Sequence, residues 1–243
     1  MEAAAKAVEL DERLSQAHEV AAIARLIDWD LSGAEREFHR ALQLDPADVR
    51  TPYAYAQLCL NPAGRHQEAA EQLRHARTLD PVARYLITEL GSTYRMSGQF
   101  ARAREEFQKS LDLNPKALGT RTNLAATDAA EGRYPEAAAR LDAVNAEGPG
   151  DPWIMGHLGY AYAKAGRTAE ARHILATLTG AHPAAALHIA AVHAGLGETS
   201  QALEWLDRGV AAHSPSMLWL KTDFRFTGLR SEPRYVAQAK SLP

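Results

Sequence analysis

The feature that most constrains this chain is an alanine that returns at an almost constant interval. Successive copies lie 35, 34, 34, 34 and 31 residues apart, and a bulky apolar residue follows each copy by four positions. The alanines are Ala34, Ala69, Ala103, Ala137, Ala171 and Ala202. A repeat near ~34 residues is typical of arrays of helix-turn-helix units. Residues four apart share one side of a helix, so the small and the bulky residue are expected to form the contact between paired helices. The sequence therefore predicts an all-α solenoid.

Glycine and proline columns keep the same interval. The glycines are Gly64, Gly98, Gly132, Gly166 and Gly197, and the prolines are Pro46, Pro81, Pro115, Pro149 and Pro183. We expect each glycine to end the first helix of a unit, because glycine adopts left-handed backbone angles without strain. We expect each proline to open the first turn of the next unit, where its missing N–H costs least.

These columns resemble the tetratricopeptide repeat family, whose antiparallel helix pairs form a right-handed superhelix. The resemblance covers residues 15–214, which divide into six units: 15–48, 49–83, 84–117, 118–151, 152–182 and 183–214. Two departures are local. Trp29 stands where the first unit should have its turn glycine, and the second unit has an extra residue near positions 60–63, which we expect its turn to absorb.

Both ends of the chain depart from the repeat. Residues 1–14 match a second helix without its first, and such a half-unit would expose an apolar edge. Either that edge marks a longer protein, or it meets a partner or a second copy. Residues 215–243 are expected to form two short capping helices, the last over 232–240 with Ser231 as its N-cap. Phe224 and Phe226 are expected to anchor this cap against the sixth unit.

A narrower resemblance rests on three stretches, DWDLSGAEREFHRAL, GETSQALEWLDRGV and DFRFTGLRSEPRY. They are similar to tetratricopeptide arrays at the C-terminal end of bacterial winged-helix transcription regulators and serine/threonine kinases. That resemblance implies a sensor or docking module of a larger bacterial regulatory protein. The chain itself has no winged helix, no glycine-rich phosphate loop and no kinase motif, so those outputs are not assigned to it.

Composition argues against several other classes. The net charge is −3, which gives no electrostatic footprint for nucleic acid or an anionic membrane. The single cysteine fits a reducing compartment, and neither a membrane-length apolar run nor a secretory signal is visible, so a cytoplasmic protein is expected. No GxSxG, Walker loop or GxGxxG occurs, and the ten histidines lack metal-ligand spacing. We expect no enzyme activity, no cofactor and no metal.

The concave face of such an array is lined by the first helix of each unit. Helical spacing places twelve residues on that face. They are Arg50, Tyr53, Gln57, Tyr85, Thr88, Ser92, Arg95, Thr122, Asn123, Trp153, Tyr160 and Lys164. Tyrosine, tryptophan and arginine dominate binding hot spots, because they bury large areas and keep a polar group. The pattern predicts a groove for a peptide or protein segment.

Three further interpretations stay open. In the family, some arrays hold a peptide's terminal carboxylate; here Asn123, Lys164 and Arg95 fall on neighbouring units, although the full pattern is absent. A small-ligand sensor is the first alternative to protein binding. Self-association through the N-terminal edge, giving a homodimer, is the second.

Overall fold

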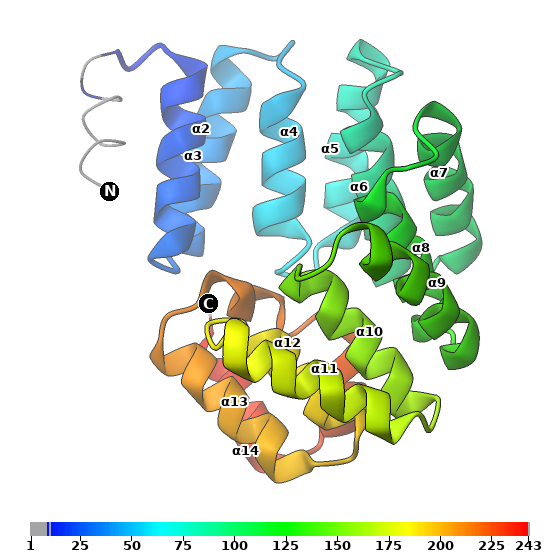
Figure 1. Ribbon diagram of the computed structural model, residues 1–243. Helices are drawn as coiled ribbons and strands as arrows, with labels where there is room; N and C mark the ends of the chain where they lie inside the picture. Colours follow the sequence, from blue (N-terminus) through cyan, green and yellow to red (C-terminus); the bar gives the residue numbers. More distant parts are fainter. Residues whose placement is uncertain (1–8, 10, 243) are drawn as a thin grey trace.

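A computed structural model describes residues 9 and 11–242, and within them the chain is helical without strands (Figure 1). The first two pairs are α2 (Ser15–Ile27) with α3 (Leu31–Leu44), and α4 (Arg50–Tyr55) continuing as η1 (Ala56–Leu60) with α5 (His66–Leu79). The next two are α6 (Arg84–Met96) with α7 (Phe100–Leu113), and α8 (Leu118–Ala130) with α9 (Tyr134–Glu147). The last two are α10 (Pro152–Lys164) with α11 (Thr168–Ala181), and α12 (Ala186–Gly195) with α13 (Thr199–Ala211). The expected solenoid of six helix pairs is confirmed.

The alanine column marks the contact between paired helices. All six recurrent alanines are 0% exposed, and the bulky residues that follow them are buried too. In the third unit, Gly91 of the first helix meets the bulky residue of the second directly: a Cβ added at Gly91 would lie 2.6 Å from the Phe107 ring. A larger side chain at Gly91 or at a column alanine would push the two helices apart, which explains why these positions hold glycine and alanine.

The glycine column occupies the turn inside each pair. Gly98 and Gly132 have φ of 76° and 81°, and the other three column glycines also lie in the left-handed region. Trp29 takes the same place in the first unit with φ of 60°. The expected equivalence of Trp29 and the glycines is therefore confirmed, although tryptophan adopts this conformation at a steric cost that glycine avoids.

The proline expectation was wrong in its position. Each column proline lies three or four residues before the next helix begins, in the turn between units rather than in the first helical turn. Four of these turns are closed by a backbone hydrogen bond, from Asp48 to Asp45, from Ala83 to Asp80, from Ala117 to Asn114 and from Ala185 to His182. Proline is favoured at the second position of such a turn, because its ring fixes the required φ.

The extra residue of the second unit was also misplaced. It is absorbed inside the helix, where η1 has π-helical hydrogen bonding, and not in the turn. The amide of Asn61 donates to the carbonyl of Ala56, five residues earlier, at 2.9 Å. One inserted residue widens a helical turn in this way. The widened turn also carries Asn61 into the interior, where its amide donates to Glu89 at 2.8 Å.

The C-terminal segment consists of three short helices instead of two. They are the 3-10 helices η2 (Pro215–Trp219) and η3 (Phe224–Leu229), and α14 (Pro233–Ser241). Glu232, not Ser231, is the N-cap residue of α14, without a capping side-chain bond. Phe226 is fully buried in one cluster with Leu206, as expected. Phe224 instead turns toward α10, with its ring 5.8 Å from that of Tyr160.

This segment brings the two ends of the array together (Figure 1). Trp29, in the turn of the first unit, lies 3.9 Å from the ring of His213, measured between centroids, and packs against the buried C-terminal cluster. The C-terminal helices thus reach back to the start of the array. The expected half-unit at 1–14 lies largely outside the described residues. No described helix is long and apolar enough to span a membrane.

Candidate functional site

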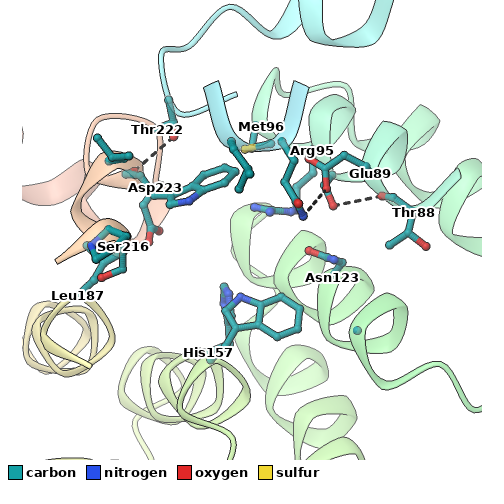
Figure 2. A pocket seen from close by; sticks show the side chains of 18 of the residues that line it. Thr88, Glu89, Arg95, Met96, Asn123, His157, Leu187, Ser216, Thr222 and Asp223 are labelled. Atoms are coloured by element: carbon teal, nitrogen blue, oxygen red, sulfur yellow. Dashed lines mark hydrogen bonds between the residues drawn. The ribbon is translucent and has the colours of Figure 1, made fainter. Parts of the chain in front are cut away.

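The concave face of the array holds a cavity of about 730 Å³ that is open to solvent on one side. The first helix of every unit contributes to it, from Ile23 of α2 to Leu187 of α12. The C-terminal segment forms the remaining wall, with Trp219 of η2 and Phe224 of η3. Ser216, Thr222 and Asp223 mark this wall in Figure 2. An open groove would be typical of the superhelix alone; here the returning C-terminal segment converts part of it into a pocket.

Eight of the twelve residues placed on the concave face line this cavity. They are Tyr53, Gln57, Tyr85, Thr88, Ser92, Arg95, Asn123 and Trp153. They come from four successive units, and neighbouring units touch through them: the rings of Tyr53 and Tyr85 lie 5.0 Å apart in an edge-on arrangement. The aromatic side chains of the second and third units therefore form one continuous surface.

The other four residues do not line the cavity. Thr122 is 0% exposed, and its hydroxyl donates to the carbonyl of Leu118. It lies one position before Asn123, and one position along a helix is a rotation of about 100°, so its side chain faces the core instead of the cavity. Tyr160 is buried beneath Phe224. Lys164 is exposed, with its ammonium 5.4 Å from the ring centre of Tyr134. Arg50 is exposed and lies 3.6 Å from Glu19.

These placements decide the carboxylate expectation as well. Arg95 and Asn123 share the cavity, but Lys164 lies outside it, so the three side chains do not form one site. All four residues chosen on α6 line the cavity, whereas only Asn123 of the two on α8 and only Trp153 of the three on α10 do so. On α10 the side chains that reach the cavity are Trp153 and His157, four residues apart.

Sequence reasoning missed the most polar part of the pocket. Glu89 and His157 lie one helical turn after Tyr85 and Trp153, so the same periodicity could have found them. His188 of α12 and the Asp223–Arg225 stretch had no such signal. Asp223 and Arg225 reach the cavity because the C-terminal segment folds back onto α12.

Glu89 is a buried carboxyl on the floor of the cavity. Its side chain accepts hydrogen bonds from Asn61 at 2.8 Å and from Gln57 at 3.4 Å. Burial raises the pKa of Glu89 to about 7, because removal from water disfavours the charged form more than the two amide donors and Arg95 favour it. At neutral pH the group is therefore close to half ionised.

Asp223 and Arg225 form a buried ion pair at the C-terminal wall. The guanidinium contacts both carboxylate oxygens, with the shortest separation 2.5 Å, and it also lies 3.4 Å from Nδ1 of His188. Burial acts to raise the pKa of Asp223, but Arg225 outweighs it and the pKa is lowered. Burial, and then Arg225, lowers the pKa of His188 to about 3. His188 is therefore neutral at physiological pH.

No catalytic arrangement is evident among these groups. Cys59 is buried within the second unit, on η1, and burial raises the pKa of its thiol to about 11, so it is not an activated nucleophile. Within the described part of the chain, no three histidine, cysteine or acidic side chains are grouped to hold a metal. The cavity is equipped for binding: apolar walls, aromatic rings and a few buried polar groups.

Comparison with known proteins agrees with this architecture. A family profile described as tetratricopeptide repeat matches residues 94–146 and 128–184, and a second with the same description matches 157–216. Together they span residues 94–216, half of the chain. No curated protein sequence matches significantly.

Solved structures with related folds include PilF of Pseudomonas aeruginosa, with 27% identity over 74% of this chain and 82% of that one, at a TM-score of 0.56. PilW, a type IV pilus biogenesis factor, has 19% identity over 85% of this chain and 97% of that one, at a TM-score of 0.60. The Cut9–Hcn1 hetero-tetramer of the APC/C gives 18% identity and a TM-score of 0.66, over 98% of this chain and 44% of the matched one.

PilW and Cut9–Hcn1 support the fold alone. The narrower resemblance to transcription regulators and kinases stays a prediction. With its phased repeat columns, its six stacked helix pairs and the two matching family profiles, the chain belongs to the tetratricopeptide repeat family.

Proposed function

We propose that the protein is a non-catalytic interaction module that binds a short segment of a partner protein in the cavity. The observation that carries this proposal is the convergence of aromatic and polar side chains from successive first helices on one cavity. Tyr53, Tyr85 and Trp153 supply large apolar surfaces, and such residues provide most of the energy at protein interfaces.

The size of the cavity limits what enters it. A volume of about 730 Å³ lies within the range of roughly 300–1,000 Å³ that suits a drug-sized ligand or a few side chains. A folded domain cannot enter, so the partner contributes a short extended segment. The narrower resemblance of the sequence adds the proposal that the module serves a larger bacterial regulatory protein in the cytoplasm.

Affinity capture followed by mass spectrometry tests this function. The wild-type protein is compared with a Tyr53→Ala, Tyr85→Ala, Trp153→Ala variant that loses three cavity side chains. A matched control, Leu79→Ala, Val82→Ala, Leu113→Ala, removes exposed apolar side chains elsewhere. We expect a partner that wild type and control retain and the cavity variant loses. A partner retained by all three proteins would place binding on another surface and refute the proposal.

A small-ligand sensor is the second candidate, and the enclosing C-terminal wall favours it. Ligands that bind only the folded state raise its melting temperature, so a thermal-shift screen of metabolites is the direct test. Self-association through residues 1–14 stays a prediction; a molecular mass that does not change with protein concentration would exclude it.

A further inference from the structure

Two residues with unusual backbone conformations meet where the two ends of the array approach each other. Trp29 lies in the turn of the first unit with φ of 60°, and His213 follows α13 with φ of 52°. They are the two non-glycine residues of the described chain in the left-handed region. Their ring centroids are 3.9 Å apart, with 77° between the ring planes. Residues with a Cβ adopt this conformation at a cost, and keep it where another contact holds them.

The turn of the first unit does not itself require a tryptophan. Glycine occupies the same place in the other five units. The backbone closes both kinds of turn alike: the amide of Asp30 donates to the carbonyl of Arg25 at 2.9 Å. In the third unit the amide of Gln99 donates to the carbonyl of Tyr94 at 2.8 Å. The indole Nε1 is buried without a hydrogen-bond partner among the described residues, so the ring contributes through packing, against His213 and the buried C-terminal cluster.

The C-terminal segment is attached to the two ends of the array in different ways. It is bound to the sixth unit by directed hydrogen bonds, such as the one from the side-chain amide of Gln238 to the carbonyl of Leu203 at 2.9 Å. On the first two units it rests by packing: Trp29 contacts the C-terminal cluster, and a Cβ added at Gly64 would lie 3.9 Å from the methyl group of Thr222. If the ends of the array separate, the segment therefore stays with the sixth unit.

The boundary between the C-terminal segment and the first two units, which we call the seam, runs beside the cavity. Ile23 and Ile27 of α2 line the cavity on one side of the seam, and Leu218 and Trp219 of η2 line it on the other. In Figure 1 the C-terminal segment lies across the ends of α2 and α3. Each unit of a solenoid contacts mainly its neighbours, so small rotations at successive junctions add up at the ends. Such rotations would part the two walls of the cavity at the seam.

We propose that Trp29 and His213 form a releasable latch that closes the array into a ring around the cavity. With the latch closed, the α2 and η2 walls hold the ligand between them. With the latch open, an extended partner segment enters from the side. Neighbouring extended chains lie about 5 Å apart, so an opening of about that size is sufficient. This inference rests on the cavity being the ligand site of the proposed function, and it adds how the ligand is admitted and retained.

Distances between two spin labels across the seam test the latch. The labels are attached to Arg36→Cys on α3 and Glu204→Cys on α13, both exposed, in a Cys59→Ala background that lacks the native thiol. Glycine adopts positive φ without strain, so Trp29→Gly and His213→Gly remove the rings and keep both turns. We expect one main distance in the parent protein, and a shift to longer distances by about 5 Å or more in each glycine variant.

Two controls separate the latch from a general loss of structure. Trp29→Phe keeps an aromatic ring in the turn and should retain the parent distance. The double glycine variant should open no further than either single variant, because both single variants break the same contact. Urea unfolding shows whether each variant is folded, and His213→Gly keeps the test valid if Trp29→Gly is not.

The latch is refuted if the glycine variants keep the parent distance, if their effects add in the double variant, or if Trp29→Phe opens the array as far as Trp29→Gly. Its failure is separable from that of the proposed function, because unchanged distances would leave partner capture by the aromatic cavity side chains unaffected. A partner captured in the cavity should dissociate about 10-fold faster from Trp29→Gly than from the wild-type protein. Equal dissociation rates would show that the latch does not retain the ligand.

Discussion

The buried carboxyl of Glu89 gives the sharpest prediction about the cavity. Its side chain is 6% exposed, and burial raises its pKa to about 7 from an ordinary value of 4.5. Replacement by glutamine removes the ionisable group and keeps the size and an oxygen that accepts from Asn61. The variant therefore isolates the cost of holding a carboxylate in the cavity from the cost of losing contacts.

The sign and size of the effect follow from linkage. Since the folded-state pKa lies above the unfolded one, the folded protein holds a proton that the unfolded chain has released between pH 4.5 and 7. The contribution of Glu89 to stability is thus fully present below pH 4.5 and is lost as the pH rises through 7. At about 1.4 kcal/mol for each pH unit between the two pKa values, the loss approaches about 3 kcal/mol above pH 8. Glu89→Gln should therefore be more stable than wild type by up to that amount at pH 8.5.

Urea unfolding followed by circular dichroism at pH 4.5, 7 and 8.5 measures this difference. We expect nearly equal midpoints at pH 4.5 and a higher midpoint for Glu89→Gln at pH 8.5, with equal slopes, so that the comparison is of whole-array unfolding. Glu105→Gln, an exposed glutamate on α7, is the control and should show little change. The reasoning is refuted if the Glu89→Gln difference is independent of pH, or if the wild-type protein is the more stable at pH 8.5.

Three other predictions concern the wall and the helix contacts. The pKa of His188 is lowered to about 3, so the unfolded chain binds a proton before the folded protein does as the pH falls below 6.5. The wild-type protein should therefore lose about 2 kcal/mol of stability from this group by pH 5, and His188→Gln should lose less stability over the same pH range in urea unfolding. Ala103→Leu should lower the free energy of unfolding by about 1–3 kcal/mol, because it overpacks a fully buried contact, whereas Ala101→Leu on the exposed side of the same helix should change it little. Equal urea midpoints for the two variants would show that the buried face of this helix is wrongly assigned. Gly159→Ala should lower the melting temperature, because the added Cβ would lie 2.7 Å from a valine side chain of α12. Gly180→Ala, with open space around it, should leave the free energy of unfolding unchanged or raise it by up to about 1 kcal/mol, and a Gly159→Ala variant more stable than wild type would contradict this packing.

The repeat architecture could be predicted because it depends on local periodicity. The alanine column alone located the contact between helices in every unit, and the glycine column located the turns. The proline position was missed by a few residues, because proline is compatible both with a helix start and with a turn. The π-helical turn at Ala56–Leu60 could not be predicted, since an inserted residue has no sequence mark that separates a wide helical turn from a long loop.

The candidate site was predictable only in part, and there is a physical reason why some of its residues could be predicted and others could not. Tyr85, Arg95 and Asn123 follow from helical spacing, because the concave face is a property of single helices. A one-residue error in that spacing was enough to place buried Thr122 on the face. Phe224 and Arg225 depend on how far the superhelix curves before the C-terminal segment meets it, and curvature accumulates from small rotations in every repeat.

The C-terminal segment does more than cover the end of the array. Phe224 lies within ring-contact distance of Tyr160 and His157, and its centre is 5.9 Å from the Arg95 guanidinium carbon. The wall and the polar side chains of the concave face are therefore parts of one structure. If the segment left the groove, Arg95 and His157 would become more exposed to water. A ligand that binds the closed cavity must by linkage also stabilise the folded-back segment, because the site is complete only in that state.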